Sequence, residues 1–316
     1  MLYLHIGSMK TGSTAIQSFI GSEVETSFGH RQMQSLGLGQ AWKLNLALID
    51  NYQYLRGCNF WRDRPDADFK SLKDSLFSDL RSEIASGPDR RFVASSEHLL
   101  SQFQGENPER IGALKDELLD IFGDVRIIVY LRDQRDFIKS WYSQFLKGSS
   151  TMTLTFEEFV DTLPDREWMW NYSKPLKVWS DAFGSDRIRV SIFDKRALHE
   201  GDLLKDFLYH IDADPDEIDD RKIDHQKREN VSPTFAQLKA IRRISKLPGH
   251  HHAIHKKALR RLFVNAHTRR FGQTSFPDTF DQNIVKLASD GNEWINRIFL
   301  DGATIKLPTQ PGSDNE

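Results

Sequence analysis

Hydrophobic positions along this chain alternate between short continuous runs and helical spacings. Four apolar runs have the length and the bounding turn residues of buried β-strands: 2–6, 91–95, 125–131 and 188–193. Apolar residues three or four positions apart predict helices between them, at 13–24, 67–85, 108–122 and 134–147. Strands that alternate with helices indicate an α/β fold with a central, mostly parallel sheet flanked by helices.

The rest of the chain shows weaker patterns. Further helices are predicted at 203–208, 235–247 and 253–265. The charged stretch 212–234 contains two prolines and is typical of a loop, whereas 29–60 shows no clear period. We expect one domain over 1–307, followed by a frayed polar tail at 308–316.

Composition narrows the class of protein. Hydrophobic residues make up 39% of the chain, charged residues 28%, and the net charge is −2, as in an ordinary globular protein that does not bind nucleic acid. No run approaches the roughly 20 apolar residues of a membrane span. Cys58 is the single cysteine, so no intramolecular disulfide can form. Because the first strand begins at once, we expect no targeting segment and a cytoplasmic location.

A glycine-containing loop follows the first strand. It reads Gly7-Ser8-Met9-Lys10-Thr11-Gly12-Ser13-Thr14 and leads directly into the first predicted helix. The first N–H groups of a helix have no intrahelical partner and face anions together with the positive end of the helix dipole. Lys10 adds a positive charge, and Ser13 and Thr14 add hydroxyl donors. The loop therefore predicts a phosphate site, with a chance turn as the alternative.

The loop differs from that of enzymes that use nucleoside triphosphates. Their pattern G-x-x-x-x-G-K-[ST] places lysine directly after the last glycine. Here Lys10 precedes Gly12, which argues against ATP or GTP with Mg²⁺ on the loop hydroxyl.

A second candidate site follows the run 125–131. Arg132 stands at the carboxyl end of that predicted strand, where open α/β sheets bind ligands, and Ser140 follows eight residues later. An arginine fork with a hydroxyl suits a terminal phosphate dianion. In the alternative interpretation, Arg132 pairs with Asp133 or Asp136 and Ser140 faces solvent.

The orders G-x-x-K-T-G-[ST]-T and Arg-x₇-Ser resemble the two phosphate motifs of sulfotransferases that use 3′-phosphoadenosine 5′-phosphosulfate (PAPS). Weaker likeness over 156–159 and 172–193 resembles their bacterial carbohydrate-type branch. The resemblance implies a P-loop-like three-layer fold, no metal, and 3′-phosphoadenosine 5′-phosphate (PAP) as spent donor. It assigns donor binding to Lys10, Thr11, Gly12, Ser13, Thr14, Arg132, Ser140, Lys227 and Arg228.

Sulfuryl transfer needs charge stabilised on the leaving oxygen and a base for the acceptor proton. Lys10 is the candidate for the first role. Glu97 and His98, at the end of the run 91–95, are both candidates for the base. Ser95-Ser96-Glu97 resembles the bacterial enzymes and favours Glu97, whereas other sulfotransferases carry His at this strand end. His5 is interpreted as a core residue.

Other polar and aromatic clusters each have a structural and a functional interpretation. The segment 221–272 holds 14 Lys or Arg and two acidic residues, which fits a solvated surface, an anionic acceptor or a membrane surface. His250, His251, His252 and His255 could bind a metal but fit a solvated loop better. Trp168, Trp170 and Trp179 could stack on a sugar but are more often core residues.

We therefore expect a sulfotransferase with a hydroxylated acceptor such as a carbohydrate or a lipid-linked molecule. The alternatives are a nucleotide-dependent P-loop-like kinase and a non-catalytic nucleotide-binding module. The sequence predicts neither the identity of the acceptor nor the oligomeric state.

Overall fold

The computed structural model describes ten parts of the chain: residues 1–22, 33–36, 41, 43–48, 68–84, 91–102, 107–148, 153–213, 234–245 and 276–311. Its sheet has five strands in the order β2-β3-β1-β4-β5. Their bounds are β1 (Leu2–Gly7), β2 (Met33–Ser35), β3 (Arg91–Ser95), β4 (Val125–Leu131) and β5 (Ile188–Ile192). Every neighbouring pair is parallel, which confirms the predicted α/β class.

Contacts group the chain into two compact units. The first comprises Met1–Arg132, Tyr172–Asp224 and Glu293–Leu307, and the second comprises Asp133–Asn171, His225–Asn292 and Pro308–Glu316. The sheet belongs to the first unit. The single domain expected over 1–307 stays a prediction.

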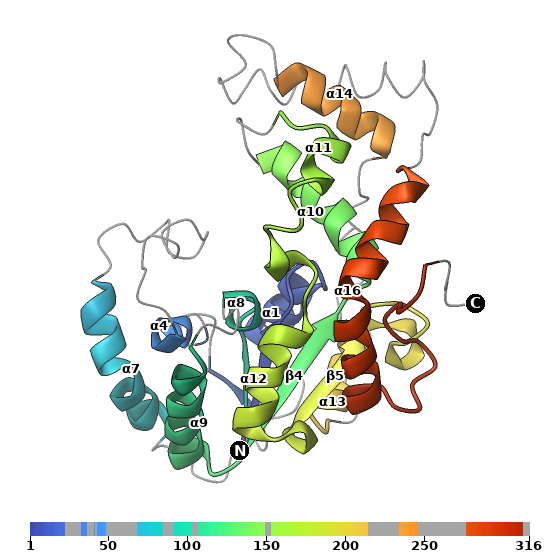
Figure 1. The fold of residues 1–316 in the computed structure, drawn as a ribbon. Helices are drawn as coiled ribbons and strands as arrows, with labels where there is room; N and C mark the ends of the chain where they lie inside the picture. The colour runs from blue at the N-terminus through green and yellow to red at the C-terminus, as the bar shows by residue number, and fades with distance from the viewer. Residues whose placement is uncertain are drawn as a thin grey trace. The chain divides into compact units, whose positions relative to one another are not determined.

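Four of the described helices of the first unit follow the predicted periods. The described helices of this unit are α1 (Ser13–Ser22), α4 (Asn45–Leu48), α7 (Phe69–Ile84), α8 (His98–Gln102), α9 (Pro108–Phe122), α12 (Ser173–Phe183) and α13 (Leu203–His210), with short 3₁₀ turns η2 (Ser185–Arg187) and η3 (His199–Gly201). The helices expected at 13–24, 67–85, 108–122 and 203–208 are thus confirmed as α1, α7, α9 and α13. In Figure 1, α9 and α12 lie next to each other, and β4 and β5 run side by side.

The second unit is helical. It contains α10 (Gln134–Gly148), α11 (Phe156–Val160), η1 (Glu167–Met169) and α14 (Phe235–Ser245), and α16 (Asp278–Phe299) contributes its residues up to Asn292. The predictions over 134–147 and 235–247 are confirmed, whereas the helix predicted at 253–265 lies outside the described residues. Gln134, fully buried, exchanges two amide hydrogen bonds with Asn292 at 2.6 and 3.2 Å, which ties the first turn of α10 to α16.

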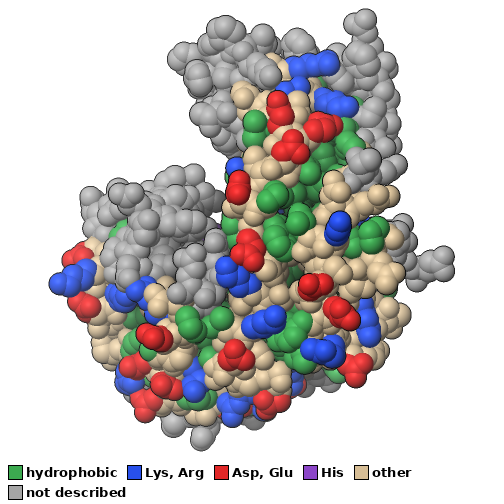
Figure 2. Space-filling model, viewed as in Figure 1, with side chains coloured by type: hydrophobic (Ala, Val, Ile, Leu, Met, Phe, Trp, Pro, Cys, Tyr) green, Lys and Arg blue, Asp and Glu red, His purple; other side chains and the backbone are tan. Residues whose placement is uncertain are grey.

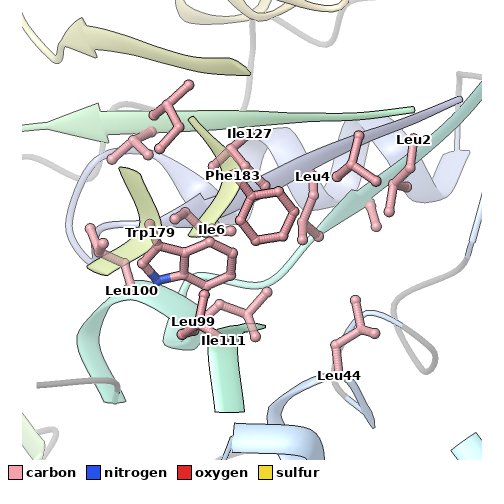
Figure 3. Close-up of a cluster of buried hydrophobic side chains, with 14 of the residues drawn as sticks. Leu2, Leu4, Ile6, Leu44, Leu99, Leu100, Ile111, Ile127, Trp179 and Phe183 are labelled. Carbon is pink, nitrogen blue, oxygen red and sulfur yellow. The ribbon is translucent and has the colours of Figure 1, made fainter. Parts of the chain in front are cut away.

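One face of the sheet carries the larger core. Alternate residues of β1 and β4 point to this face, where α7, α9 and α12 cover them. Trp179 and Phe183 of α12 stack with ring centroids 5.4 Å apart. Figure 3 shows both rings packed among leucine and isoleucine side chains of the strands and of α8. Both faces of the central strands are therefore buried, as parallel sheets require.

The opposite face mixes apolar and polar side chains beneath α1 and α13. His5 Nδ1 lies 2.7 Å from Ser95 Oγ, and the His5 ring packs edge-on against Tyr130. The Tyr130 hydroxyl donates to Asp206 at 2.8 Å. Burial without a counter-charge lowers the pKa of His5 from its ordinary 6.5 to about 3. His5 is therefore a core residue, as expected.

The described part of the chain contains no helix with the length and hydrophobicity needed to cross a membrane.

His5 should make stability depend on pH. In the unfolded chain its imidazole protonates below about 6.5, whereas folded His5 stays neutral down to about 3. Between these values the unfolded state binds more protons, so the free energy of unfolding falls as pH falls, by about 1.4 kcal/mol per unit for this group. We expect His5→Asn to flatten this slope in urea denaturation measured between pH 7.5 and 5. The matched control is His199→Gln, which removes an exposed imidazole. An unchanged slope in His5→Asn would contradict the burial of a neutral imidazole.

Candidate functional site

The loop between β1 and α1 is held by its own side chains and by β4. The Ser8 amide donates to the carbonyl of Tyr130 at 3.0 Å. The hydroxyls of Thr11 and Ser13 donate to the Ser8 carbonyl at 2.6 and 3.2 Å. The Thr11 hydroxyl thus stabilises the conformation of the loop. Its role in the predicted donor site is therefore structural.

Three residues of the loop adopt left-handed backbone conformations. Gly7 and Gly12 have φ of 99° and 80°, and Lys10, which is not a glycine, has φ of 66°. Interspersed left-handed residues of this kind occur in the backbone nests that bind anions. A lysine in this region is strained, and the strain persists only where the surrounding structure fixes the backbone. Such strained residues are concentrated at functional sites.

Two close contacts explain why glycine is needed at both ends of the loop. A Cβ atom on Gly7 would lie 2.5 Å from the carbonyl oxygen of Glu97, and one on Gly12 would lie 2.3 Å from Leu203 Cδ2 and 3.2 Å from the ring of Phe193. The first contact sets the backbone of Glu97 directly against the loop. Because β3 is the parallel neighbour of β1, its carboxyl end reaches the loop, as predicted.

The side chain of Glu97 is partly buried. Burial raises the pKa of Glu97 above its ordinary value, while a hydrogen bond from Ser13 and the charge of Lys10 act in the opposite direction. Lys10 and Ser13 were both assigned to the donor loop from sequence. The electrostatic environment of Glu97 thus includes two residues that were predicted to bind the donor.

His98, the first residue of α8, is the neighbour of Glu97. Its Nε2 lies 3.9 Å from Glu97 Oε1, and 12% of its side chain is exposed against 25% for Glu97. Burial lowers the pKa of His98 to about 4, so its imidazole is neutral at pH 7. A neutral imidazole and a carboxylate can each accept a proton. Glu97 and His98 are thus neighbours, and the choice between them as the base stays a prediction.

Arg132 lies on the other side of β1, at the end of β4. Its Nη1 is 3.4 Å from the Lys10 carbonyl oxygen, and its guanidinium carbon is 5.9 Å from the centroid of the Phe193 ring. Asp133, a partner considered for Arg132, forms a salt bridge with Arg135 at 2.7 Å. Arg132 therefore borders the loop. Ser140 belongs to α10 in the second unit, and its action with Arg132 stays a prediction.

Sequence reasoning missed Phe193 and Leu203, which approach Gly12. Phe193 follows β5 directly, and Leu203 begins α13. The rule that ligand sites lie beyond the carboxyl ends of parallel strands would have indicated Phe193. No sequence signal marked Leu203, because its contact depends on the course of the chain after β5.

Several predicted residues lie outside the described residues. They are Cys58, Lys227, Arg228, His250, His251, His252, His255 and all of 221–272 except 234–245. On the face shown in Figure 2, described acidic and basic side chains are interspersed rather than separated by sign. Within the described ranges, no group of three or more His, Cys, Asp or Glu residues could hold a metal ion. The absence of a metal from the reaction remains a prediction.

The three tryptophans have different environments. Trp179 is fully buried in the core of the first unit and is not available to an acceptor. In the second unit, Trp168 packs against Trp141 with centroids 5.5 Å apart, and Trp170 donates its indole N–H to the Leu163 carbonyl at 3.0 Å. The core interpretation is confirmed for Trp179.

A groove of about 660 Å³ between α7 and α9 lies apart from the loop. Its charged rim is partly neutralised, because Arg81 pairs with Glu117 and Asp120 at 2.8 and 2.7 Å. None of the predicted site residues lines this groove.

Comparison with solved structures shows a likeness to a sulfotransferase from Alicyclobacillus acidocaldarius. The identity is 15% and the TM-score 0.43, over 70% of this chain and 84% of that chain. No protein-family model matches the chain, and neither does any curated protein. The residues of this chain are therefore the basis for its proposed function.

Replacing Gly7 by Ala tests the contact between the loop and Glu97. The new methyl group would meet backbone atoms of Glu97 at a φ that disfavours alanine. We expect Gly7→Ala to lower the free energy of unfolding by at least about 2 kcal/mol in urea denaturation. Gly112→Ala is the matched control, since a Cβ atom there meets nothing within 4 Å inside α9. It should be neutral or stabilise by about 0.5–1 kcal/mol. Equal effects of the two changes would contradict the close approach.

Proposed function

We propose that the protein is a PAPS-dependent sulfotransferase that transfers a sulfuryl group to a hydroxyl or amine of a carbohydrate, glycolipid or related acceptor. A cytoplasmic location belongs to the same proposal. The observation that carries it is the loop Gly7–Thr14, in which a left-handed Lys10 precedes Gly12 at the end of a parallel strand. This order fits a phosphosulfate and departs from the triphosphate pattern.

The residues of the loop have distinct roles in this proposal. Lys10 neutralises the charge that develops on the 5′-phosphate oxygen as its bond to sulfur breaks. Ser13 and the first amides of α1 bind the same phosphate. Arg132, which borders the loop through the Lys10 carbonyl, binds the 3′-phosphate of the donor. Only the resemblance to the sulfotransferase motif adds Ser140 to this role. The resemblance to sulfotransferases suggests that Lys227 and Arg228 close over this phosphate, and they are proposed on that ground alone.

Transfer requires the acceptor to lose a proton as its oxygen or nitrogen attacks sulfur. Glu97 is the proposed base, because burial raises its proton affinity while its carboxylate stays beside the loop. His98 is the second candidate, and its depressed pKa of about 4 makes its imidazole a weaker base than the Glu97 carboxylate. In either case the proton moves from the acceptor to Glu97, which directly precedes α8, or to His98, the first residue of α8.

The two alternatives make different predictions about ligands. A nucleotide-dependent kinase would bind ATP with Mg²⁺ in preference to PAP. A non-catalytic module would bind PAP but would transfer no sulfuryl group. In that case Glu97→Gln would behave like the wild type. The position of Lys10 before Gly12 favours the sulfotransferase over the kinase.

Calorimetric titration of PAP beside ATP with Mg²⁺ tests the proposal. We expect PAP to bind and ATP with Mg²⁺ to bind at least about tenfold more weakly. Lys10→Ala and Arg132→Ala should each weaken PAP by about tenfold or more, since each removes a charge-assisted contact worth about 1.5–3 kcal/mol. Lys174→Ala removes a lysine on α12 of the same unit and serves as the charge control. Preference for ATP, or no binding of PAP, would contradict the proposal.

A further inference from the structure

The ring of Phe193 contacts both parts of the candidate donor site. Phe193 follows β5 directly, and its amide donates to the Leu131 carbonyl at 2.7 Å, which places it beside Arg132 at the end of β4. The guanidinium carbon of Arg132 lies over the Phe193 ring, 5.9 Å from its centroid. On the side of the loop, a Cβ atom on Gly12 would lie 3.2 Å from the same ring. One aromatic ring therefore borders both the loop and the guanidinium.

We propose that Phe193 is a positioning residue, which holds the Arg132 guanidinium beside the loop and thereby sets the preference for a nucleotide with a 3′-phosphate. The inference rests on the proposed function, in which Arg132 binds that phosphate. Phe193 acts through Arg132 and makes no hydrogen bond to the phosphate itself.

The side chain of Arg132 gains from such a support. An arginine has many rotamers, and ordering it on a phosphate costs free energy unless the protein orders it beforehand. The contact of Arg132 with the Lys10 carbonyl is 3.4 Å long, which is long for a hydrogen bond, so it restrains the side chain weakly. The face of an aromatic ring attracts a guanidinium and adds a second restraint. Because a guanidinium presents its N–H groups along its edge, a ring at its face leaves donors for an anion.

The ring is suited to this role because its own position is fixed. The hydrogen bond to the Leu131 carbonyl ties the backbone of Phe193 to β4, and its side chain is half-buried. Gly12 leaves room for the ring, since a side chain there would collide with Leu203 Cδ2 at 2.3 Å and press on Phe193. The glycine at the end of the loop thus allows the ring and Arg132 to lie close to the loop together.

A purely structural role for Phe193 makes a different prediction. If the ring only packed against Gly12 to shape the loop, its loss would weaken binding of the 5′-phosphate as well. PAP and 5′-AMP differ only in the 3′-phosphate, so the ratio of their affinities separates the two roles.

Phe193→Leu tests the inference, because leucine keeps an apolar side chain but has no aromatic face. In calorimetry, with 5′-AMP measured by displacement of PAP, we expect the variant to bind PAP about fivefold more weakly and 5′-AMP less than about twofold more weakly than the wild type. Phe193→Tyr keeps the ring and should bind PAP within about twofold of the wild type. Phe77→Leu is the matched control, because it removes a half-buried ring in the groove between α7 and α9, apart from the loop.

A double-mutant cycle shows whether Phe193 acts through Arg132. In an Arg132→Ala background, Phe193→Leu has no guanidinium left to release. We expect it to change PAP affinity there by less than about twofold, against about fivefold in the wild-type background. A fivefold loss that persists in the Arg132→Ala background would overturn the inference.

The outcomes separate this inference from the proposed function. If the wild type binds PAP and Phe193→Leu binds it equally well, or loses PAP and 5′-AMP to the same extent, the positioning role is wrong and the sulfotransferase proposal stands. If the wild type does not bind PAP, both proposals fall together.

Discussion

The contact between Gly7 and the backbone of Glu97 is the constraint on which the candidate site depends. The parallel order β3-β1-β4 sets β1 between two strands, so the loop that follows β1 is bordered by the residues after both neighbours. Only a residue without a side chain allows β3 to come this close. Glu97 on one side and Arg132 on the other thus border the same loop through sheet topology.

The balance of charge at this loop explains how one site could both bind an anion and deprotonate an acceptor. Lys10 is the cation, His98 stays neutral because burial lowers its pKa, and Glu97 is poised between protonation by burial and ionisation by Lys10 and Ser13.

Much of this arrangement could be predicted from sequence because it depends on local patterns. Four strands and the helices beside them follow from apolar runs and helical spacing, and the loop follows from its glycines and Lys10. Strand β2 has three residues and offers too short a pattern. Helix α16 was missed because its buried stripe includes the polar Asn292, which is fully buried and pairs with Gln134. Phe193 and Leu203 reach Gly12 only through tertiary packing.

The proposed function depends on binding of the 5′-phosphate end of the donor by the loop Gly7–Thr14. A crystal structure of the protein grown with PAP would test this binding. We predict the 5′-phosphate against the loop amides, with Lys10 and Ser13 within hydrogen-bonding distance. A bisphosphate bound with both phosphates away from this loop would contradict the proposal.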